Sequence, residues 1–372
     1  MSGPLQGIRV VELLGIGPGP FCGMLLADLG ADVVRVERPD GTSLGRTPIL
    51  GRGKRSVGMD LKTAEGRAAV LELAAHADVF IEPFRPGFVE RLGLGPDDCL
   101  AVNPKLVYGR MTGWGQSGPY ADRAGHDLNY IALSGALSTC GTADGPPVPP
   151  VNMLGDFAGG SMFLAAGVLA AVLYARETGR GPVVDAAMID GSAYLTATTL
   201  QSMAAGRWGP RGTNVLDTGA PYYNVYQAAD GWVSIGAIEP RFWAELLDVL
   251  GLTDDEQFVR QNDREMWPQM KKHFAEIFRE RTRVEWAEAF AGRDACFAPV
   301  WDLDEAPDEQ HLKDRGTFVT EFGVRQPAPA PRFSVTPGAT GGPCPNPGEH
   351  TEEVLREWGL PQRNSSDERE IV

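Results

Sequence analysis

Cysteines are scarce in this sequence and none are paired by spacing. The five cysteines lie far apart, are odd in number and include no C-x-x-C pair. That pattern argues against a disulfide framework and against a zinc site built from closely spaced cysteines. An H-E-x-x-H motif is missing as well, and with it the usual helical zinc signature. We therefore expect reduced thiols, a cytoplasmic location and no bound metal.

Long apolar runs and an excess of positive charge are also missing. The longest apolar run, Met162 to Ala175, is shorter than the ~20 residues that a bilayer span needs, and we expect it to form a buried helix. The N-terminus lacks the basic start and apolar stretch of a signal peptide. A net charge of −15 argues against nucleic-acid and anionic membrane partners, whose binding depends on phosphate neutralisation. An anionic ligand would need a local basic patch.

Short apolar runs alternate with helical patterns through the first half of the chain. The predicted strands and helices are strands at 7–14, 31–36, 78–84, 106–112 and 183–187, and helices at 21–29, 63–77 and 156–176. Such alternation is typical of βαβ units and of a doubly wound parallel sheet. We therefore predict the α/β class, with a Rossmann-like large domain over residues 1–188.

The pattern changes after residue 220. Two strand-like runs flank Asp230-Gly231, which indicates a hairpin, and Pro240 stands where a helix would begin. With helical segments at 241–250 and 284–291, this predicts a smaller α+β domain over 225–310, reached through a linker at 189–224. Residues 311–360, which include a proline- and glycine-rich stretch at 326–348, are predicted to return to the large domain, and residues 361–372 to be disordered.

The first predicted strand leads into a glycine-rich turn, Gly15 to Pro20, and Glu37 follows about 20 residues later. This arrangement resembles a dinucleotide-binding start, but the spacing does not fit. Counting from Gly15 the sixth residue is Pro20, and counting from Gly17 it is Cys22, so neither register gives G-x-G-x-x-G. We interpret the turn as close packing of a helix on a strand.

Positive charge gathers in one stretch of this acidic chain. Residues 35–55 hold only two anions, Glu37 and Asp40, against six cations: Arg35, Arg38, Arg46, Arg52, Lys54 and Arg55. Guanidinium groups bind phosphate oxygens bidentately, so several on one loop could hold a polyphosphate. The alternative is a solvated loop with scattered ion pairs, and composition leaves both open. Arg85, in the segment F-R-P-G, is another possible contributor.

Two polar side chains stand at predicted helix starts. His126 follows Gly125 and precedes an apolar helix predicted at 127–138, and Asp156 precedes the long helix at 156–176. Either residue could simply cap its helix. A base at each helix start is also what a proton exchange at one carbon would need, because one group removes the proton and another returns it. Free N–H groups at a helix start would then stabilise the anion formed between these steps.

A third candidate for this chemistry is Glu239, which precedes Pro240 at a predicted strand end. A carboxylate there could orient a histidine by hydrogen bonding. The alternative, an ordinary glutamate in the first turn of a helix, has equal weight.

A series of motifs resembles the family III CoA-transferase and racemase superfamily. They include G-I-R-V-V-E-L near the N-terminus, A-D-V-V-R-V-E-R-P-D-G, G-R-G-K-R-S-V-G-M-D-L-K and M-T-G-W-G-Q-S-G-P, and the resemblance runs from about residue 5 to 360. Within it, G-H-D-L-N-Y, N-x-x-G-D-F-x-G-G-S-M, G-A-P-Y-Y and G-A-I-E-P are similar to the racemase branch. A histidine at position 126 is not typical of the transferase branch.

This resemblance implies proton transfer by His126 and Asp156 through an enolate of an acyl-CoA thioester, held by the helix start from Gly125 to Asp127. It further implies that Glu239 polarises His126, and that Asn152 and Tyr222 support the aspartate. The implied coenzyme A contacts are Arg38, Arg52 and Arg85, with Lys54, Arg55 and Phe84 beside them. It also implies an interlocked homodimer and no cofactor beyond the coenzyme A of the substrate.

Two alternatives remain beside the racemase. In a family III CoA transferase, Asp156 would be a covalent nucleophile that forms acyl-anhydride and CoA-ester intermediates. In a CoA-ester sensor, the same scaffold would bind its ligand without chemistry. The acyl chain is not identified by the sequence, because branched fatty acyl, sterol or bile-acid side chains and arylpropionyl groups share one reacting centre.

Overall fold

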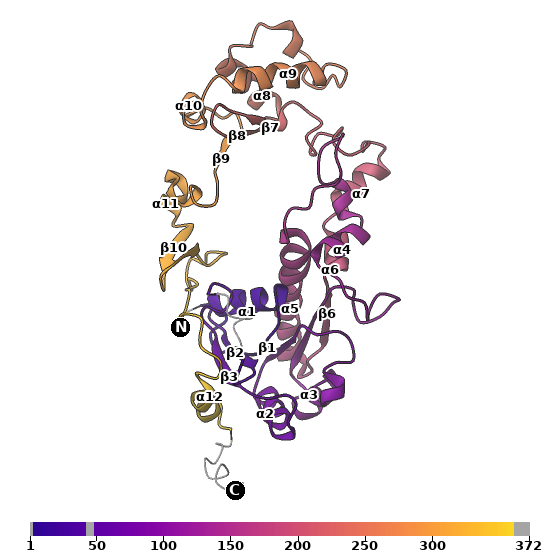
Figure 1. Ribbon diagram of the computed structural model, residues 1–372, viewed down its shortest axis with the longest axis vertical. Helices are drawn as coiled ribbons and strands as arrows, with labels where there is room; N and C mark the ends of the chain where they lie inside the picture. The colour runs from indigo at the N-terminus through magenta and orange to yellow at the C-terminus, as the bar shows by residue number, and fades with distance from the viewer. Residues whose placement is uncertain (1–2, 42–47, 361–372) are drawn as a thin grey trace. The chain divides into compact units, whose positions relative to one another are not determined.

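The computed structural model describes residues 3–41 and 48–360 (Figure 1). The chain divides into two compact units. Unit 1 comprises Met1–Ser134, Val151–Leu195 and Gly316–Val372, and unit 2 comprises Gly135–Pro150 and Thr196–Arg315. The predicted disordered tail, 361–372, and Arg46 of the basic stretch lie outside the described residues.

Unit 1 is built on a six-stranded sheet in the order β3-β2-β1-β4-β5-β6. Every neighbouring pair is parallel. The strands are β1 (Arg9–Leu13), β2 (Asp32–Glu37), β3 (Arg55–Gly58), β4 (Val79–Glu82), β5 (Val107–Thr112) and β6 (Val183–Ala187). The predicted doubly wound parallel sheet is confirmed. Strand order reverses between β1 and β4, and ligands of such sheets bind beyond the carboxyl ends of the strands at that point.

Helices cover both faces of the sheet. Because side chains alternate along a strand, Val10 packs in one core and Val11 in the other. The first core is closed by α1 (Pro18–Asp28) and α5 (Met162–Thr178). The second core is closed by α2 (Ala64–Ala75), α3 (Pro96–Val102) and α12 (Thr351–Glu357). As predicted, α2 begins after Thr63, whose hydroxyl accepts the N–H of Gly66.

Strand β3 was not predicted, because its residues belong to the basic stretch that we interpreted as a loop. It extends the sheet beside β2, in register from Val34 opposite Arg55 to Glu37 opposite Gly58. Ser56 and Val57 are completely buried. The surrounding cations and the strand's own Arg55 and Ser56 gave no apolar run by which this short strand could be predicted.

The longest helical stretch, Met153–Thr178, is the one described helix long and apolar enough to cross a membrane by length and composition. A core helix passes the same test. Leu164, Val168 and Val172 are buried in the core beneath the sheet, although Leu173 and Tyr174 on the opposite side are exposed. The predicted buried helix is therefore present, with one face outside this core.

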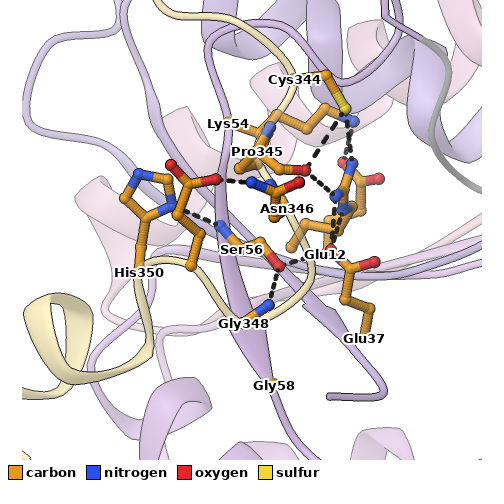
Figure 2. Close-up of polar contacts among 12 residues, drawn as sticks. Glu12, Glu37, Lys54, Ser56, Gly58, Cys344, Pro345, Asn346, Gly348 and His350 are labelled. Carbon is orange, nitrogen blue, oxygen red and sulfur yellow. Dashed lines mark hydrogen bonds and ion pairs between the residues drawn. The ribbon is translucent and has the colours of Figure 1, made fainter. Parts of the chain in front are cut away.

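The C-terminal segment of the described chain returns to unit 1. After the hairpin of β10 (Phe318–Glu321) and β11 (Val324–Pro327), it runs along β3 (Figure 2). The N–H of His350 is donated to the carbonyl of Ser56, and the hydroxyl of Ser56 binds Glu37. The segment thereby covers the edge of the sheet, and α12 fills the second core.

Unit 2 is a small α+β structure with an aromatic core. Its antiparallel sheet consists of β7 (Tyr223–Gln227), β8 (Trp232–Gly236) and β9 (Phe297–Val300), and its helices include α8 (Pro240–Leu250), α9 (Trp267–Phe278) and α10 (Arg283–Ala289). The predicted hairpin at Asp230-Gly231 and helix start at Pro240 are confirmed. The long helix α9 was missed.

Residues 135–150 correct the predicted boundary of the large domain. They belong to unit 2, although we predicted them inside 1–188. Arg211 explains the association, because its guanidinium donates to the carbonyl oxygens of Ser138, Thr142 and Gly145. These three contacts attach the loop to the unit that contains Arg211. The position of the loop in the sequence does not indicate this attachment.

Candidate active site

A pocket of about 400 Å³ lies in unit 1 beyond the carboxyl ends of β1, β4 and β5. This is the edge of a doubly wound sheet where ligands bind. The pocket is lined by Ile16, Gly17, Pro18, Pro83, Phe84, Arg85, Pro86, Met111, Thr112, Gly113, Trp114, Ala121, Arg123, Gly125, His126, Tyr130, Asp156 and Met188. Both proposed bases and one proposed cation, separated by up to 71 residues in the sequence, therefore line one cavity.

His126 stands immediately before the short helix α4 (Asp127–Leu133). Its backbone is held by the turn: the N–H is donated to the side-chain oxygen of Asn129 at 3.1 Å, and the carbonyl accepts the N–H of Asn129 at 2.8 Å. The imidazole itself makes no capping hydrogen bond, and the residue is exposed and lines the pocket. The helix start fixes the backbone and leaves the ring nitrogens available to a ligand.

Asp156 lies inside a π-helical segment, Met153–Ser161, that leads into α5. It is therefore not the N-cap that we considered, since Asn152 occupies that position. Wider π-helical turns often occur at functional sites. The amide of Asn152 donates to Oδ2 of Asp156 at 3.0 Å, which is the contact expected if Asn152 supports the aspartate.

The environment of Asp156 favours a carboxyl group that can exchange protons. Burial raises its pKa above the ordinary value, the hydrogen bond from Asn152 lowers it, Asp127 raises it and His126 lowers it. The influence of His126 shows that the two side chains lie within electrostatic range of each other. A raised pKa brings the carboxyl closer to the range in which a general acid and base works.

Asp127 joins the two helix starts. Its Oδ2 accepts the backbone N–H groups of Gly155 at 2.6 Å and Asp156 at 2.8 Å, and the residue is buried. No hydrogen-bond partner is described for the other oxygen, Oδ1. Gly155 permits this contact, because a Cβ there would lie 2.5 Å from the carboxylate. The residue beside His126 thus positions the backbone of Asp156.

The prediction that the helix start from Gly125 to Asp127 stabilises an anion needs correction. The helix α4 has only seven residues, so its dipole is small, and Asn129 already accepts the N–H of His126. Of the backbone donors predicted from Gly125 to Asp127, that one is occupied. The N–H groups of Gly125 and Asp127 remain as individual donors.

Comparison with known proteins shows the family to which the chain belongs. The model of CoA-transferase family III matches residues 5–351. This chain belongs to that family. It is 47% identical over 362 residues to the α-methylacyl-CoA racemase of Mus musculus, covering 96% of this chain and 94% of the racemase. It is 30% identical to the succinyl-CoA:glutarate CoA-transferase of the same species, covering 95% of this chain and 86% of the transferase. The crystal structure of a CaiB/BaiF family protein from Brucella suis matches 96% of this chain and 100% of that chain with a TM-score of 0.84 and 28% identity.

Two residues of the basic stretch that were predicted to contact coenzyme A are buried and paired within this family III chain. Arg52 forms a two-pronged ion pair with Asp28 and also donates to Gln326. Lys54 donates to Glu12 at 2.6 Å, and both side chains are completely buried. Buried pairs of this kind cannot turn to a ligand without leaving an unpaired charge. We therefore withdraw the predicted coenzyme A contacts of Arg52 and Lys54.

Arg55 and Arg38 differ in their surroundings. Arg55, on β3, contacts Asp32 of β2 and two glutamates of α12, Glu353 and Glu357, so it holds α12 on the sheet and is also withdrawn. Among the residues that the structure describes, Arg38 pairs with Asp40, and the two side chains are 57% and 70% exposed. An exposed pair is worth little, so Arg38 can exchange its carboxylate for a phosphate. The local excess of cations is thus largely balanced by acids from distant parts of the sequence.

Arg85 and Phe84 line the pocket on the loop that follows β4. Arg85 is exposed, and the loop is anchored from below by Glu82, whose carboxylate accepts the N–H of Phe84 at 2.8 Å and a hydrogen bond from Arg110 at 2.9 Å. Burial raises the pKa of Glu82 to about 7, while the Phe84 N–H and Arg110 lower it. A buried polar group therefore sets the position of a cation at the pocket rim.

The glycine turn packs as predicted and also borders the site. A Cβ at Gly15 would lie 2.3 Å from Pro83, so this glycine permits close approach of the loop after β4. Gly17 has a φ of +67°, and a Cβ there would lie 3.3 Å from Oδ2 of Asp156. The turn thus shapes the pocket wall beside the carboxylate.

Glu239 and Tyr222 belong to unit 2. Glu239 is exposed at the N-cap of α8. Tyr222 is buried among Trp243 and Trp267, and its hydroxyl donates to Asn262 at 2.7 Å. Within unit 2, these contacts make Tyr222 a core residue. The contacts predicted for Glu239 with His126 and for Tyr222 with Asp156 stay predictions.

Sequence analysis missed Tyr130 and Trp114, two aromatic residues of the pocket. They pack edge to face with ring centroids 4.7 Å apart. Tyr130 lies four residues after His126, one helical turn away, and this spacing was the available signal. Trp114 stands between Gly113 and Gly115 directly after β5, at a strand end where site residues gather.

Proposed function

We propose that this chain is an α-methylacyl-CoA racemase that interconverts (R)- and (S)-2-methylacyl-CoA thioesters by moving one proton at the α-carbon. The observation that carries the proposal is a single pocket lined by His126, Asp156 and Arg85. A histidine, a carboxylate and a cation are the groups needed to exchange a proton twice and to hold an anionic ester. The mouse relative that is 47% identical is named for this activity.

The reaction begins when one base removes the α-proton. The C–H bond breaks, its electron pair moves into the thioester carbonyl, and an enolate forms. The other base, present as its conjugate acid, donates a proton to the opposite face of the same carbon. The two bases exchange protonation states in each turnover, and the catalyst resets by proton exchange with water. No cofactor takes part in this proposal.

The enolate sets the energetic demand. If the carbon acid exceeds its base by ~10 pKa units, transfer is uphill by ~14 kcal/mol before any stabilisation. The activation barrier that is compatible with typical turnover is only slightly higher than this. Hydrogen-bond donors must therefore surround the oxygen anion. The N–H groups of Gly125 and Asp127 are the donors proposed for this, and the raised pKa of Asp156 narrows the difference in pKa between the base and the carbon acid.

Coenzyme A binding is assigned to Arg85, Arg38 and Phe84. Arg85 and Phe84 stand at the pocket, and the exposed pair of Arg38 with Asp40 is easily opened.

We also retain the interlocked homodimer as a proposal. Apolar side chains exposed on α5 and α6 (Met188–Tyr194), including Leu173, Tyr174 and Tyr194, are consistent with a partner subunit. Light scattering that gives the mass of one chain at micromolar concentration would refute the dimer.

The test is exchange with deuterated water. A single enantiomer of a 2-methylacyl-CoA is incubated with the protein in D₂O, without any acyl acceptor. A racemase incorporates deuterium at the α-carbon while the enantiomers equilibrate. His126→Ala and Asp156→Ala are each expected to abolish racemisation while CoA-ester binding persists.

Each alternative gives a different result. A family III CoA transferase, using Asp156 as covalent nucleophile, would keep the α-hydrogen and transfer coenzyme A only when a second acid is added. A CoA-ester sensor would bind tightly and exchange nothing. Either outcome with the wild-type chain overturns the proposal. A panel of 2-methylacyl-CoA esters with fatty, sterol and arylpropionyl chains then identifies the acyl group.

A further inference from the structure

Tyr130 is buried beside the pocket with its hydroxyl pointing back along the chain. It is the fourth residue of α4, one turn after His126, and its ring packs edge to face against Trp114. The hydroxyl donates to the carbonyl oxygen of Gly125 at 2.5 Å. That carbonyl belongs to the peptide bond joining Gly125 to His126, so the contact acts directly on the backbone that carries the imidazole.

Three contacts together enclose His126. Tyr130 holds the peptide before it, the side chain of Asn129 accepts its N–H, and its carbonyl accepts the backbone N–H of Asn129. The peptide planes on both sides of the residue are therefore fixed. The backbone of a residue held in this way has little freedom, which leaves rotation of the imidazole as its remaining motion.

Two glycines make room for the Tyr130 ring. A Cβ at Gly113 would lie 2.0 Å from Cζ of Tyr130, and a Cβ at Gly125 would lie 2.7 Å from Cε1 and 2.8 Å from the ring of Trp114. Neither glycine has a positive φ, so the backbone conformation does not require glycine at these positions. The close approach of the aromatic rings does. The phenol fits a slot formed by both glycines.

The charges around the phenol keep it a neutral donor. Burial raises its pKa, Asp156 raises it further, Arg85 lowers it and Asp127 raises it. The hydroxyl therefore lies within electrostatic range of the second base and of the pocket cation. A neutral phenol at this place donates to the Gly125 carbonyl across the working range of pH.

We propose that Tyr130 is a positioning residue that fixes the location of His126 through the carbonyl of Gly125. This inference rests on the proposed racemisation. Tyr130 acts through the backbone, without contact to the reacting carbon. Misplacement of a catalytic group by about 1 Å costs up to ~100-fold in rate, so one hydroxyl at this place has an effect well beyond the stability of one hydrogen bond.

The test compares Tyr130→Phe with Tyr108→Phe. Tyr108 is also buried in unit 1, and its hydroxyl donates to the carbonyl of Leu94 at 2.8 Å in the core on the other face of the sheet. Both variants lose one buried hydrogen bond, and their melting temperatures are expected to fall by similar amounts. Only Tyr130→Phe is expected to lower kcat, by ~10-fold or more with KM within ~2-fold.

A second measurement separates positioning from general damage. In D₂O, the enantiomer whose α-hydrogen faces Asp156 still exchanges through that base, whereas its inversion requires His126. Tyr130→Phe is therefore expected to raise the ratio of exchange to inversion for one enantiomer only. Gly113→Ala displaces the same ring while keeping the hydroxyl, and it is expected to raise the same ratio for the same enantiomer. It replaces Tyr130→Phe in this test if Tyr130→Phe folds poorly.

Three outcomes overturn the inference. They are racemisation by Tyr130→Phe within ~2-fold of wild type, an equal loss of kcat in Tyr108→Phe, or an exchange ratio that rises equally for both enantiomers. A wild-type chain that does not racemise would instead refute the proposed function. The two failures are therefore distinguishable.

Discussion

The carboxylate of Asp127 accepts the backbone N–H of Asp156 at 2.8 Å. This contact joins the helix start that carries one proposed base to the helical segment that carries the other. Asp127 also accepts the N–H of Gly155, so a single side chain satisfies two donors of the π-helical segment. The relative position of the two bases therefore depends on a residue adjacent to one of them in the sequence.

Replacement of that carboxylate should lower both the stability of the protein and the rate of catalysis. Asp127→Ala leaves two buried N–H groups unpaired, and we expect the free energy of unfolding to fall by ~1–3 kcal/mol. We expect kcat to fall by at least ~10-fold, because Asp156 is released from its position. Urea denaturation and racemisation assays measure the two effects.

Asp78→Ala is the matched control. The carboxylate of Asp78 accepts the backbone N–H of Arg9 at 2.8 Å, at the end of β4 away from the pocket. It is expected to lose stability while retaining kcat within ~2-fold, since a capping contact there has no base to position. Equal loss of kcat in both variants would show that Asp127 acts through stability alone.

The acidic limb of the pH profile should depend on Asn152. Its amide donates to Oδ2 of Asp156 and lowers the pKa of that carboxyl, against the burial that raises it. Asp156 must be ionised to accept a proton, so activity falls as pH drops through its pKa. Asn152→Ala removes the contact that lowers this pKa, and we expect the acidic limb of kcat/KM to move to higher pH.

A control variant that removes an amide away from the pocket should leave the pH profile in place. Asn103→Ala, which removes amide contacts to the carbonyls of Ala74 and Ala77 far along the sheet, should move neither limb. An acidic limb that does not shift in Asn152→Ala would mean that Asp156 is not the group titrating there.

Arg85 should recognise the nucleotide end of the substrate. We expect Arg85→Ala to raise KM for a 2-methylacyl-CoA by ~10-fold, consistent with loss of ~1.4 kcal/mol from a charged contact. The same acyl group on N-acetylcysteamine carries no phosphate, and its kcat/KM should change by less than ~2-fold. Lys105→Ala removes an exposed cation before β5, at the opposite end of the strand, and should leave both substrates unaffected. Equal losses on both esters would assign Arg85 to the enolate instead.

Sequence patterns predicted the sheet because parallel strands buried on both faces read as apolar runs. They missed β3, which begins at Arg55 directly after Lys54, since the acids that neutralise these two cations come from β1, β2 and α12. His126 and Asp156 were singled out at predicted helix starts, and the structure brings both to one pocket. The contacts that place them could not be predicted, because Asp127 and Tyr130 act through backbone atoms that no residue pattern encodes.

Lys54 provides the sharpest test of a corrected residue. Its ammonium is completely buried, donates to Glu12 at 2.6 Å and to the carbonyl of Pro20 at 2.9 Å, and fixes α1 over β1. Lys54→Met leaves the Glu12 carboxylate without its partner in the core. We expect the free energy of unfolding to fall by ~3–5 kcal/mol, measured by urea denaturation.

The double variant Lys54→Met with Glu12→Gln distinguishes the two roles that Lys54 was given. Removing both charges takes away the unpaired carboxylate, so we expect it to recover part of the lost stability. If Lys54 is purely structural, KM of the folded double variant for a 2-methylacyl-CoA stays within ~2-fold of wild type. A stable double variant with a tenfold higher KM for the CoA ester, and an unchanged KM for the N-acetylcysteamine ester, would restore Lys54 to the phosphate site.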